Sequence, residues 1–381
     1  MQSAVIYGAG NIGRGFIGQV FHDSGYEVIF IDVNMEVIDA LNAKGGYTLR
    51  VVGNEEDVDT LIDNVRGIDG RDAEAVVRAI ADADLMATSI GVNILPRIAG
   101  NIASGIKRRA ASGNKHPLNI LLCENLMNAA HHMRDLLAPY FEDGQRALLE
   151  GTGLVEVTIG RMVPALPKEL SALDPTLIQV ERFCTLPVDT SKFVGDVPVL
   201  AHAEYITPFA VCEEKKLYLH NMSHALCAYL GYHKGYTYLW EAAEDDAIRA
   251  VARDAMKHTA SAIAEAYSAD EAAMDRFLEE LLERYQNRRL GDTIERVAKD
   301  PLRKLSPDDR LIGAINRCKA QGKPYDSILT GVAAALAYRP AAELQESLQK
   351  QGLLGFLTNH CGLEPEDVYA IERLLARYTM D

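Results

Sequence analysis

A glycine-rich hexapeptide near the start of the chain places the strongest constraint on its fold. Gly8-Ala9-Gly10-Asn11-Ile12-Gly13 directly follows the apolar run 4–7 and opens a helical pattern. In a strand–turn–helix unit, the first glycine permits the tight turn and the second lets the backbone approach a pyrophosphate. The third lets helix pack on strand, and the free N–H groups of the helix N-terminus bind phosphates. The motif therefore predicts a dinucleotide-binding site.

A carboxylate after the second apolar run indicates which dinucleotide binds. Asp32 stands 22 residues after Gly10, at the end of the run 28–31. A carboxylate there hydrogen-bonds the adenosine ribose and repels a 2′-phosphate, which predicts NAD rather than NADP, although the nearby Arg14 leaves NADP open. The residues expected to contact the cofactor are Gly8, Gly10, Asn11, Ile12, Gly13, Asp32 and Asn34.

Short apolar runs alternate with helical patterns in the first half of the chain, which is typical of a parallel sheet with crossover helices. The strand candidates are residues 4–7, 28–31, 85–90 and 118–122, with 155–159 and 177–183 as further strands at the sheet edge. After about residue 195 the sequence has long amphipathic patterns that are typical of helices. We predict a Rossmann-type doubly wound α/β domain (1–195), a mainly α-helical domain (196–381) and a cleft between them.

One helix of the second half has a clear start and a clear buried face. Ser268-x-x-Glu271 predicts a capping box that opens it. Its apolar stripe runs at helical spacing, so we interpret the stripe as core without a functional role. The stripe consists of Phe277, Leu278, Leu281, Leu282 and Tyr285.

Composition excludes several classes of protein. The 39 basic and 54 acidic residues give a net charge of −15, which argues against a general nucleic-acid or anionic-membrane binder. The longest apolar stretch, 328–338, is shorter than a membrane-spanning helix, and no leader pattern precedes the first strand, so we expect a cytoplasmic protein. Six cysteines without a C-x-x-C pair predict reduced, mostly buried thiols.

Two polar clusters are candidates for the chemistry. Asn125 follows the strand 118–122, at the edge where the carboxyl ends of parallel strands form the ligand crevice. Lys216, Asn221 and His224 open the helical half, and on an α-helix they fall within an arc of about 140°. A partly desolvated lysine can donate or accept a proton, while amide groups hold a developing alkoxide.

Two other interpretations of this second cluster stay open. Lys216 and Asn221 suit a solvated helix surface, and His224 suits a hydrogen-bonded core position. His220 and His224 stand i, i+4 on one helix face, which is compatible with zinc. The glutamate of H-E-x-x-H is missing, however, because position 221 is Asn, and a third ligand such as His202 or Glu204 would be required. We therefore predict no metal.

Several segments together resemble the polyol-specific long-chain dehydrogenases. They are residues 8–18, 32–34 and 123–125 and the pattern Lys216-x-x-x-x-Asn221-x-x-His224, and the similarity continues through 290–297 and 301–312. The resemblance thus covers nearly the whole chain. It implies a zinc-independent, NAD-linked interconversion of a sugar phosphate ketone and its polyol, with Lys216 as general acid/base. Asn125 and Asn221 would hold the reacting oxygen, and His224 would orient the substrate or the lysine.

The chain departs from the family pattern at one position. Gly160 stands where the family commonly has an aspartate, so any role of that carboxylate is absent or taken over by Glu156. This departure affects substrate detail more than reaction type.

A cationic segment is the candidate for a substrate phosphate. Residues 284–310 carry eight basic and five acidic side chains, a net charge of +3 in an otherwise acidic chain. Arginine forks suit phosphate, although such charges also pair with neighbouring carboxylates. Arg303, Lys304 and Arg310 are the expected ligands.

The combined interpretation is reversible reduction of fructose 6-phosphate to mannitol 1-phosphate with NADH, with Lys216 protonating the alkoxide. An unphosphorylated polyol or a keto-uronate is the alternative substrate within the same family. A ketopantoate-type reductase is a more distant alternative, against which the Asn221-x-x-His224 extension argues. A non-catalytic NAD sensor is the alternative outside enzymes. The sequence leaves the oligomeric state open.

Overall fold

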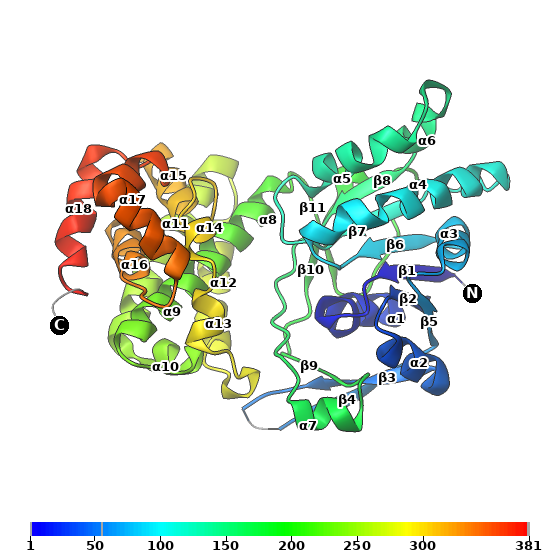
Figure 1. The fold of residues 1–381 in the computed structure, drawn as a ribbon, viewed down its shortest axis with the longest axis horizontal. Coiled ribbons are helices and arrows are strands. Elements are labelled where there is room, and N and C mark those ends of the chain that lie inside the picture. Colours follow the sequence, from blue (N-terminus) through cyan, green and yellow to red (C-terminus); the bar gives the residue numbers. More distant parts are fainter. Residues whose placement is uncertain (1, 55, 379–381) are drawn as a thin grey trace. The chain divides into compact units, whose positions relative to one another are not determined.

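The computed structural model describes residues 2–54 and 56–378, in two compact units, Met1–Phe209 and Ala210–Asp381 (Figure 1). The sequence places the boundary at residue 195, whereas the structure divides the chain after Phe209. The difference arises because strand β11 (Ala203–Ile206) pairs with β10 (Leu186–Asp189), which keeps the intervening residues in the first unit. No helix in the described ranges is long and apolar enough to cross a membrane.

A six-stranded parallel sheet forms the centre of the first unit. Its strand order is β5-β2-β1-β6-β7-β8, with the crossover between β1 and β6 that marks a doubly wound sheet. The predicted fold class is confirmed. The strands are β1 (Ser3–Tyr7), β2 (Glu27–Asp32), β5 (Val65–Asp69), β6 (Leu85–Thr88), β7 (Asn119–Leu122) and β8 (Gly153–Glu156).

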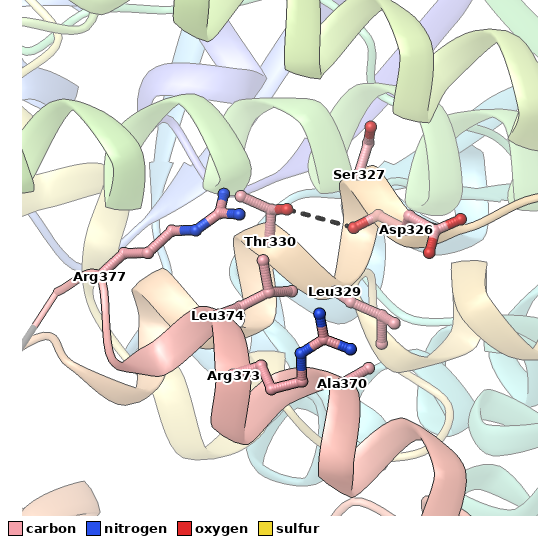
Figure 2. Close-up of a pocket in the computed structure, with 8 residues that line it drawn as sticks. All are labelled: Asp326, Ser327, Leu329, Thr330, Ala370, Arg373, Leu374 and Arg377. Carbon is pink, nitrogen blue, oxygen red and sulfur yellow. Dashed lines mark hydrogen bonds between the residues drawn. The ribbon is translucent and has the colours of Figure 1, made fainter.

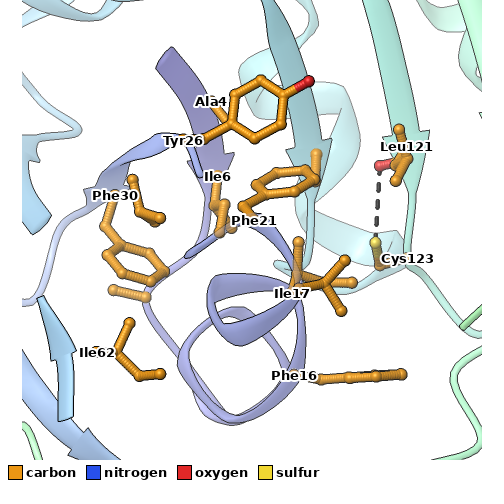
Figure 3. Packing of buried hydrophobic residues seen from close by; sticks show 14 of the residues in the cluster. Ala4, Ile6, Phe16, Ile17, Phe21, Tyr26, Phe30, Ile62, Leu121 and Cys123 are labelled. Atoms are coloured by element: carbon orange, nitrogen blue, oxygen red, sulfur yellow. Dashed lines mark hydrogen bonds between the residues drawn. The ribbon is translucent and has the colours of Figure 1, made fainter. Parts of the chain in front are cut away.

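Alternate residues of these strands pack into two separate cores. Val5 and Tyr7 of β1 face the core under α3 and α4, while Ala4 and Ile6 face the opposite core. Figure 3 shows the second core, in which Phe16, Ile17 and Phe21 pack beside strand residues. The helices of this unit are α1 (Gly18–Asp23), α2 (Met35–Lys44), α3 (Ala73–Asp82), α4 (Leu95–Ala111), α5 (Ala129–Leu137), α6 (Arg146–Glu150) and α7 (Lys168–Leu173).

The expected edge strands had different outcomes. The segment 155–159 overlaps β8, which forms one edge of the central sheet. The placement of 177–183 at that edge was wrong, because β9 (Ile178–Val180) pairs in parallel with β3 (Gly46–Val51) in a separate sheet. That sheet also contains β4 (Val58–Asp63), antiparallel to β3. The backbone N–H and C=O groups of β9 therefore find their hydrogen-bond partners in this separate sheet and not in the central one.

The second unit is helical, as predicted. The helices are α8 (Ala210–Glu214), α9 (Met222–His233), α10 (Leu239–Glu244), α11 (Asp246–Tyr267), α12 (Glu271–Arg284), α13 (Ile294–Ala298), α14 (Pro301–Lys304), α15 (Ile312–Ala320), α16 (Asp326–Leu336), α17 (Ala342–Asn359) and α18 (Pro365–Leu375). All six cysteines are free thiols, and only Cys184 among them is not fully buried.

The predicted capping box was wrong. Ser268 has a left-handed φ of 52° and ends α11, while the Asp270 side chain accepts a hydrogen bond from Ala272 N and caps α12. Aspartate caps as well as serine does, so the motif was displaced by two residues. Leu278, Leu281, Leu282 and Tyr285 of the predicted stripe are buried, and Phe277 is half-buried.

Candidate active site

Two glycines of the first loop are required by close backbone contacts, and one is left open. Gly8 has a φ of +112°, and a Cβ there would lie 2.7 Å from Ser89 O. A Cβ on Gly13 would lie 2.0 Å from Gly8 O. Gly10 is exposed, and its Cβ would meet no atom within 4 Å. The loop thus closes tightly at its ends and leaves its middle accessible, which fits the approach of a pyrophosphate.

Asp32 connects the end of β2 to this loop. Its carboxylate accepts hydrogen bonds from Ala9 N at 2.7 Å and from Asn34 N at 2.9 Å. The next residue, Val33, is 64% exposed and offers apolar surface beside the carboxylate. Asp32, Asn34, Gly10 and Asn11 are therefore brought to the carboxyl edge of β1 and β2, where the sequence places the cofactor.

Arg14 has a structural role in this unit. Its buried guanidinium donates to Ala9 O at 2.6 Å, to Thr176 O at 2.7 Å and to Pro175 O at 3.0 Å. Burial lowers the pKa of Arg14, and Tyr47 and Asp32 oppose that shift. Because the side chain is buried and its Nε and Nη1 donate to backbone carbonyls, the proximity of Arg14 in sequence gives no argument for a 2′-phosphate.

Glu124 links the carboxyl ends of two neighbouring strands. It is buried and accepts from Thr88 Oγ1 at 2.7 Å and from Ile90 N at 3.2 Å. Burial raises the pKa of its carboxyl, against these hydrogen bonds. Asn125 follows directly and is exposed. The buried glutamate thus fixes the loop that presents Asn125, a function that the sequence did not predict.

Two residues bear on the departure from the family pattern. Glu156 is buried at the end of β8, and its Oε1 accepts from Ala130 N at 2.9 Å in the first turn of α5. At Gly160 a Cβ would lie 3.2 Å from the ring of Phe183. The Glu156 carboxylate therefore has a structural partner of its own at a helix start.

The second unit presents Lys216 and Asn221 from a π-helical segment, Lys215–Asn221. An α-helix was expected there. In a π-helix the backbone hydrogen bonds run from i to i+5, so residues five apart lie on one face. Lys216 and Asn221 have that spacing and come closer in angle than the α-helical arc predicts. His224 follows in α9.

An aromatic cluster surrounds this segment. The ring of Tyr285 lies 6.0 Å from that of His220 and 5.2 Å from that of His224. Its hydroxyl donates to His220 O at 2.8 Å and contacts Ser223 Oγ at 3.0 Å. The sequence assigned Tyr285 to the core alone; its only distinguishing signal was a hydroxyl on an otherwise apolar stripe.

Two polar side chains of this cluster, the buried Asn221 and the half-buried His224, each have a polar atom with no hydrogen-bond partner in the part of the chain that the structure describes. The Asn221 Nδ2 donor has no hydrogen-bond partner among the described residues. His224 Nε2 lies 3.4 Å from Asp292 Oδ2, an ion-pair contact without hydrogen-bond geometry, and Asp292 also pairs with Arg296. Burial lowers the pKa of His224, against the neighbouring Asp292. A buried amide donor without a partner is suited to receive a ligand oxygen.

The three expected phosphate ligands lie in different surroundings. Arg303 and Arg310 both pair with Asp309, at 2.8 and 2.7 Å, and Arg303 is exposed. Lys304 is 4% exposed, and its ammonium donates to the carbonyls of Val297 and Lys299. Burial and the nearby Arg310 and Arg303 lower the pKa of Lys304 to about 7. Arg303 is thus exposed and Arg310 is buried, and both pair with one carboxylate, whereas the ammonium of Lys304 binds backbone carbonyls inside the segment.

A cavity in the second unit lies apart from these clusters. Within residues 2–54 and 56–378, no three His, Cys, Asp or Glu side chains are grouped so that they could hold a metal ion. A cavity of about 350 Å³ lies between α16 and α18 (Figure 2). None of the predicted site residues lines this cavity. Its lining consists of Asp326, Ser327, Leu329, Thr330, Ala370, Arg373, Leu374 and Arg377.

Comparison with known proteins covers most of the chain. A relative from Brevibacillus brevis named mannitol-1-phosphate 5-dehydrogenase is 38% identical, over 94% of this chain and 93% of the relative. A relative of the same name from Bacillus pumilus is 35% identical, over 96% of each chain. Neither comparison identifies the residues that act in this chain.

Solved structures share the fold at low sequence identity. Mannitol 2-dehydrogenase from Pseudomonas fluorescens has a TM-score of 0.75 at 19% identity, over 98% of this chain and 91% of that one. A D-sorbitol dehydrogenase also has a TM-score of 0.75, at 16% identity, over 88% of this chain and 79% of that one. The family descriptions "Mannitol dehydrogenase Rossmann domain" and "Mannitol dehydrogenase C-terminal domain" match residues 2–202 and 206–349. The chain therefore belongs to the mannitol dehydrogenase family.

Proposed function

We propose that this chain is an NAD-dependent oxidoreductase that interconverts fructose 6-phosphate and mannitol 1-phosphate. The observation that carries the proposal is the similarity, over nearly the full length of both chains, to two relatives named mannitol-1-phosphate 5-dehydrogenase. The glycine loop and Asp32 fit the cofactor, since Gly10 leaves the backbone open and the Asp32 carboxylate disfavours a 2′-phosphate. When bound, NADH supplies the hydride that reduces the ketone carbon.

Lys216 is the proton donor in the reducing direction. Its Nζ gives a proton to the alkoxide that forms at C2 of the ketose, and it takes the proton back in the oxidising direction. The buried Asn221 Nδ2 stabilises the same oxygen, because no residue in the described part of the chain competes for this donor. Asn125 is the second amide assigned to that oxygen, and His224 orients the substrate hydroxyls. No metal is part of this proposal.

The cationic segment holds the substrate phosphate through Arg303 and Arg310. Asp309 joins the two guanidinium groups and keeps both near one point. Guanidinium forks match phosphate geometry, so these two side chains are the preferred ligands. Lys304 supports them from beneath, because its ammonium is bonded to Val297 O and Lys299 O.

The test is NADH oxidation by chelator-treated protein with fructose 6-phosphate, fructose or a keto-uronate at equal concentrations. Turnover with the phosphate ester alone is expected. Turnover with fructose or the keto-uronate instead would support another substrate of the same family. Silence with all three would refute the proposed reaction.

The role of Lys216 has a matched control in the adjacent lysine. Lys216→Ala is expected to lower kcat by at least about 10²-fold, the usual contribution of a general acid, with little change in NADH affinity. Lys215, whose Nζ lies 4.5 Å from the Phe277 ring centroid, is the control. Lys215→Ala should retain turnover. Equal losses in both variants, or loss of NADH binding in Lys216→Ala, would contradict the assignment.

A further inference from the structure

We propose that His220 is a positioning residue that holds the ammonium group of Lys216 through its ring Nδ1. The catalytic consequence rests on the proposed function, whereas the contact itself does not. Lys216 Nζ lies 3.2 Å from His220 Nδ1, four residues further along the π-helical segment. An ammonium group has only donors, so Nδ1 must be the acceptor and the ring proton of the neutral imidazole lies on Nε2.

The surroundings keep the imidazole of His220 in this acceptor form. The side chain is buried, and burial lowers the pKa of His220 well below its usual value. The charged and titratable groups around it act in the same direction. They are Lys216, Arg284, His224 and Arg310, and Tyr285 completes the aromatic contacts. A neutral ring with a free Nδ1 lone pair is thus the stable state across the neutral pH range.

Aromatic packing fixes where that lone pair lies. The His220 ring is in edge contact with the His224 ring, with centroids 6.1 Å apart at 85°, and tilts against Tyr285 at 6.0 Å. The Tyr285 hydroxyl also holds the backbone carbonyl of His220. The acceptor is therefore rigid, whereas the four-carbon stem of a lysine has many rotamers.

A rigid acceptor restricts the lysine to the face that also carries Asn221. Displacement of a reacting group by about 1 Å can cost about 10²-fold in rate. Loss of the His220 acceptor should therefore lower kcat while leaving cofactor binding in place. This loss differs from the effect of a core defect, which lowers the stability of the fold without a specific fall in kcat.

The kinetic test uses two substitutions at His220. His220→Leu removes the acceptor, and kcat for fructose 6-phosphate is expected to fall by about 10²-fold with KM for NADH nearly unchanged. His220→Asn places an amide oxygen near the position of Nδ1 and should recover most of that loss. The control is His233→Leu, since His233 also packs against tyrosine rings and bonds one backbone carbonyl, Ala334 O, at 2.9 Å. Full kcat in His220→Leu, or equal losses in both His220 variants, would overturn the inference.

The second test needs no substrate. In protein with ¹⁵N-labelled histidine, the Nδ1 resonance of His220 should have the shift of an unprotonated acceptor, and Lys216→Met should move it. An unchanged resonance would overturn the contact. If fructose 6-phosphate is not turned over, the proposed reaction fails, and this measurement still decides whether His220 Nδ1 accepts from Lys216.

Discussion

Lys304 allows a quantitative test of how a buried charge makes the stability of this unit depend on pH. A buried lysine whose pKa is about 7 in the folded chain binds fewer protons at pH 8 than the same lysine in the unfolded chain, where the pKa is about 10.5. The free energy of unfolding then rises with pH between these two values, by about 1.4 kcal/mol for each pH unit. Below pH 7 both states are protonated and this dependence ends.

The perturbation is Lys304→Met, which keeps an unbranched side chain of nearly the same length without the charge. Between pH 7.5 and pH 9 the wild type should gain ~2 kcal/mol of stability relative to the variant, since the other titrating groups are common to both chains. Urea unfolding monitored by fluorescence reports on this unit, because Trp240 is the single tryptophan of the chain and lies in α10. Lys299→Met, at an exposed position of the same segment, is the control and should show no such trend. A flat difference for Lys304→Met would show that the carbonyls of Val297 and Lys299 keep the ammonium charged, and the reasoning would be refuted.

Two further substitutions separate folding from binding. Gly13→Ala places a Cβ 2.0 Å from Gly8 O and should destabilise the first unit by about 1–3 kcal/mol. In Gly10→Ala the Cβ meets no atom within 4 Å, so the melting temperature should stay unchanged while NADH binding weakens roughly tenfold. An equal fall in melting temperature in both variants would contradict this division. Burial raises the pKa of the Asp292 carboxyl, but the contacts with His224 and Arg296 lower it by more, so the pKa lies below its usual value. Its stabilising contribution is present above about pH 4 and is lost as the pH falls through the folded value, so Asp292→Asn should cost about 2 kcal/mol at pH 7 and progressively less towards pH 3, as followed by urea unfolding.

The features that follow local rules could be predicted from the sequence. Gly8, Gly10 and Gly13 have the spacing of a tight strand–turn–helix connection, and Asp32 follows at the matching distance. The connection was found where it was expected, and its role in cofactor binding stays a prediction. The helical second half followed from amphipathic periodicity. The β3–β4 hairpin was not predicted, because four of the six residues of β4 are exposed and its sequence has no continuous apolar run.

The features that depend on tertiary contacts could not be predicted in this way. The π-helical turn at Lys216 departs from the period of 3.6 residues on which the helical arc was calculated. Charge counting does not distinguish the buried Lys304 from the exposed Arg303. In the sequence Tyr285 is one more member of an apolar stripe. Only the tertiary fold shows that its hydroxyl donates to the carbonyl of His220.

The two π-helical segments also set a limit on how the chain tolerates changes of length. Gly13–Ile17 follows the glycine loop and Lys215–Asn221 carries the lysine, so each functional region begins with a widened helical turn. Such a turn contains one residue more than an α-helical turn would, and removal of one residue restores the ordinary winding. A single-residue deletion between Lys216 and Asn221 would therefore leave a longer regular helix, in which these two residues stand four apart and still share one face. Conversion to regular helix without a deletion would instead place Lys216 and Asn221 about 140° apart and remove their alignment, while preserving every side chain involved.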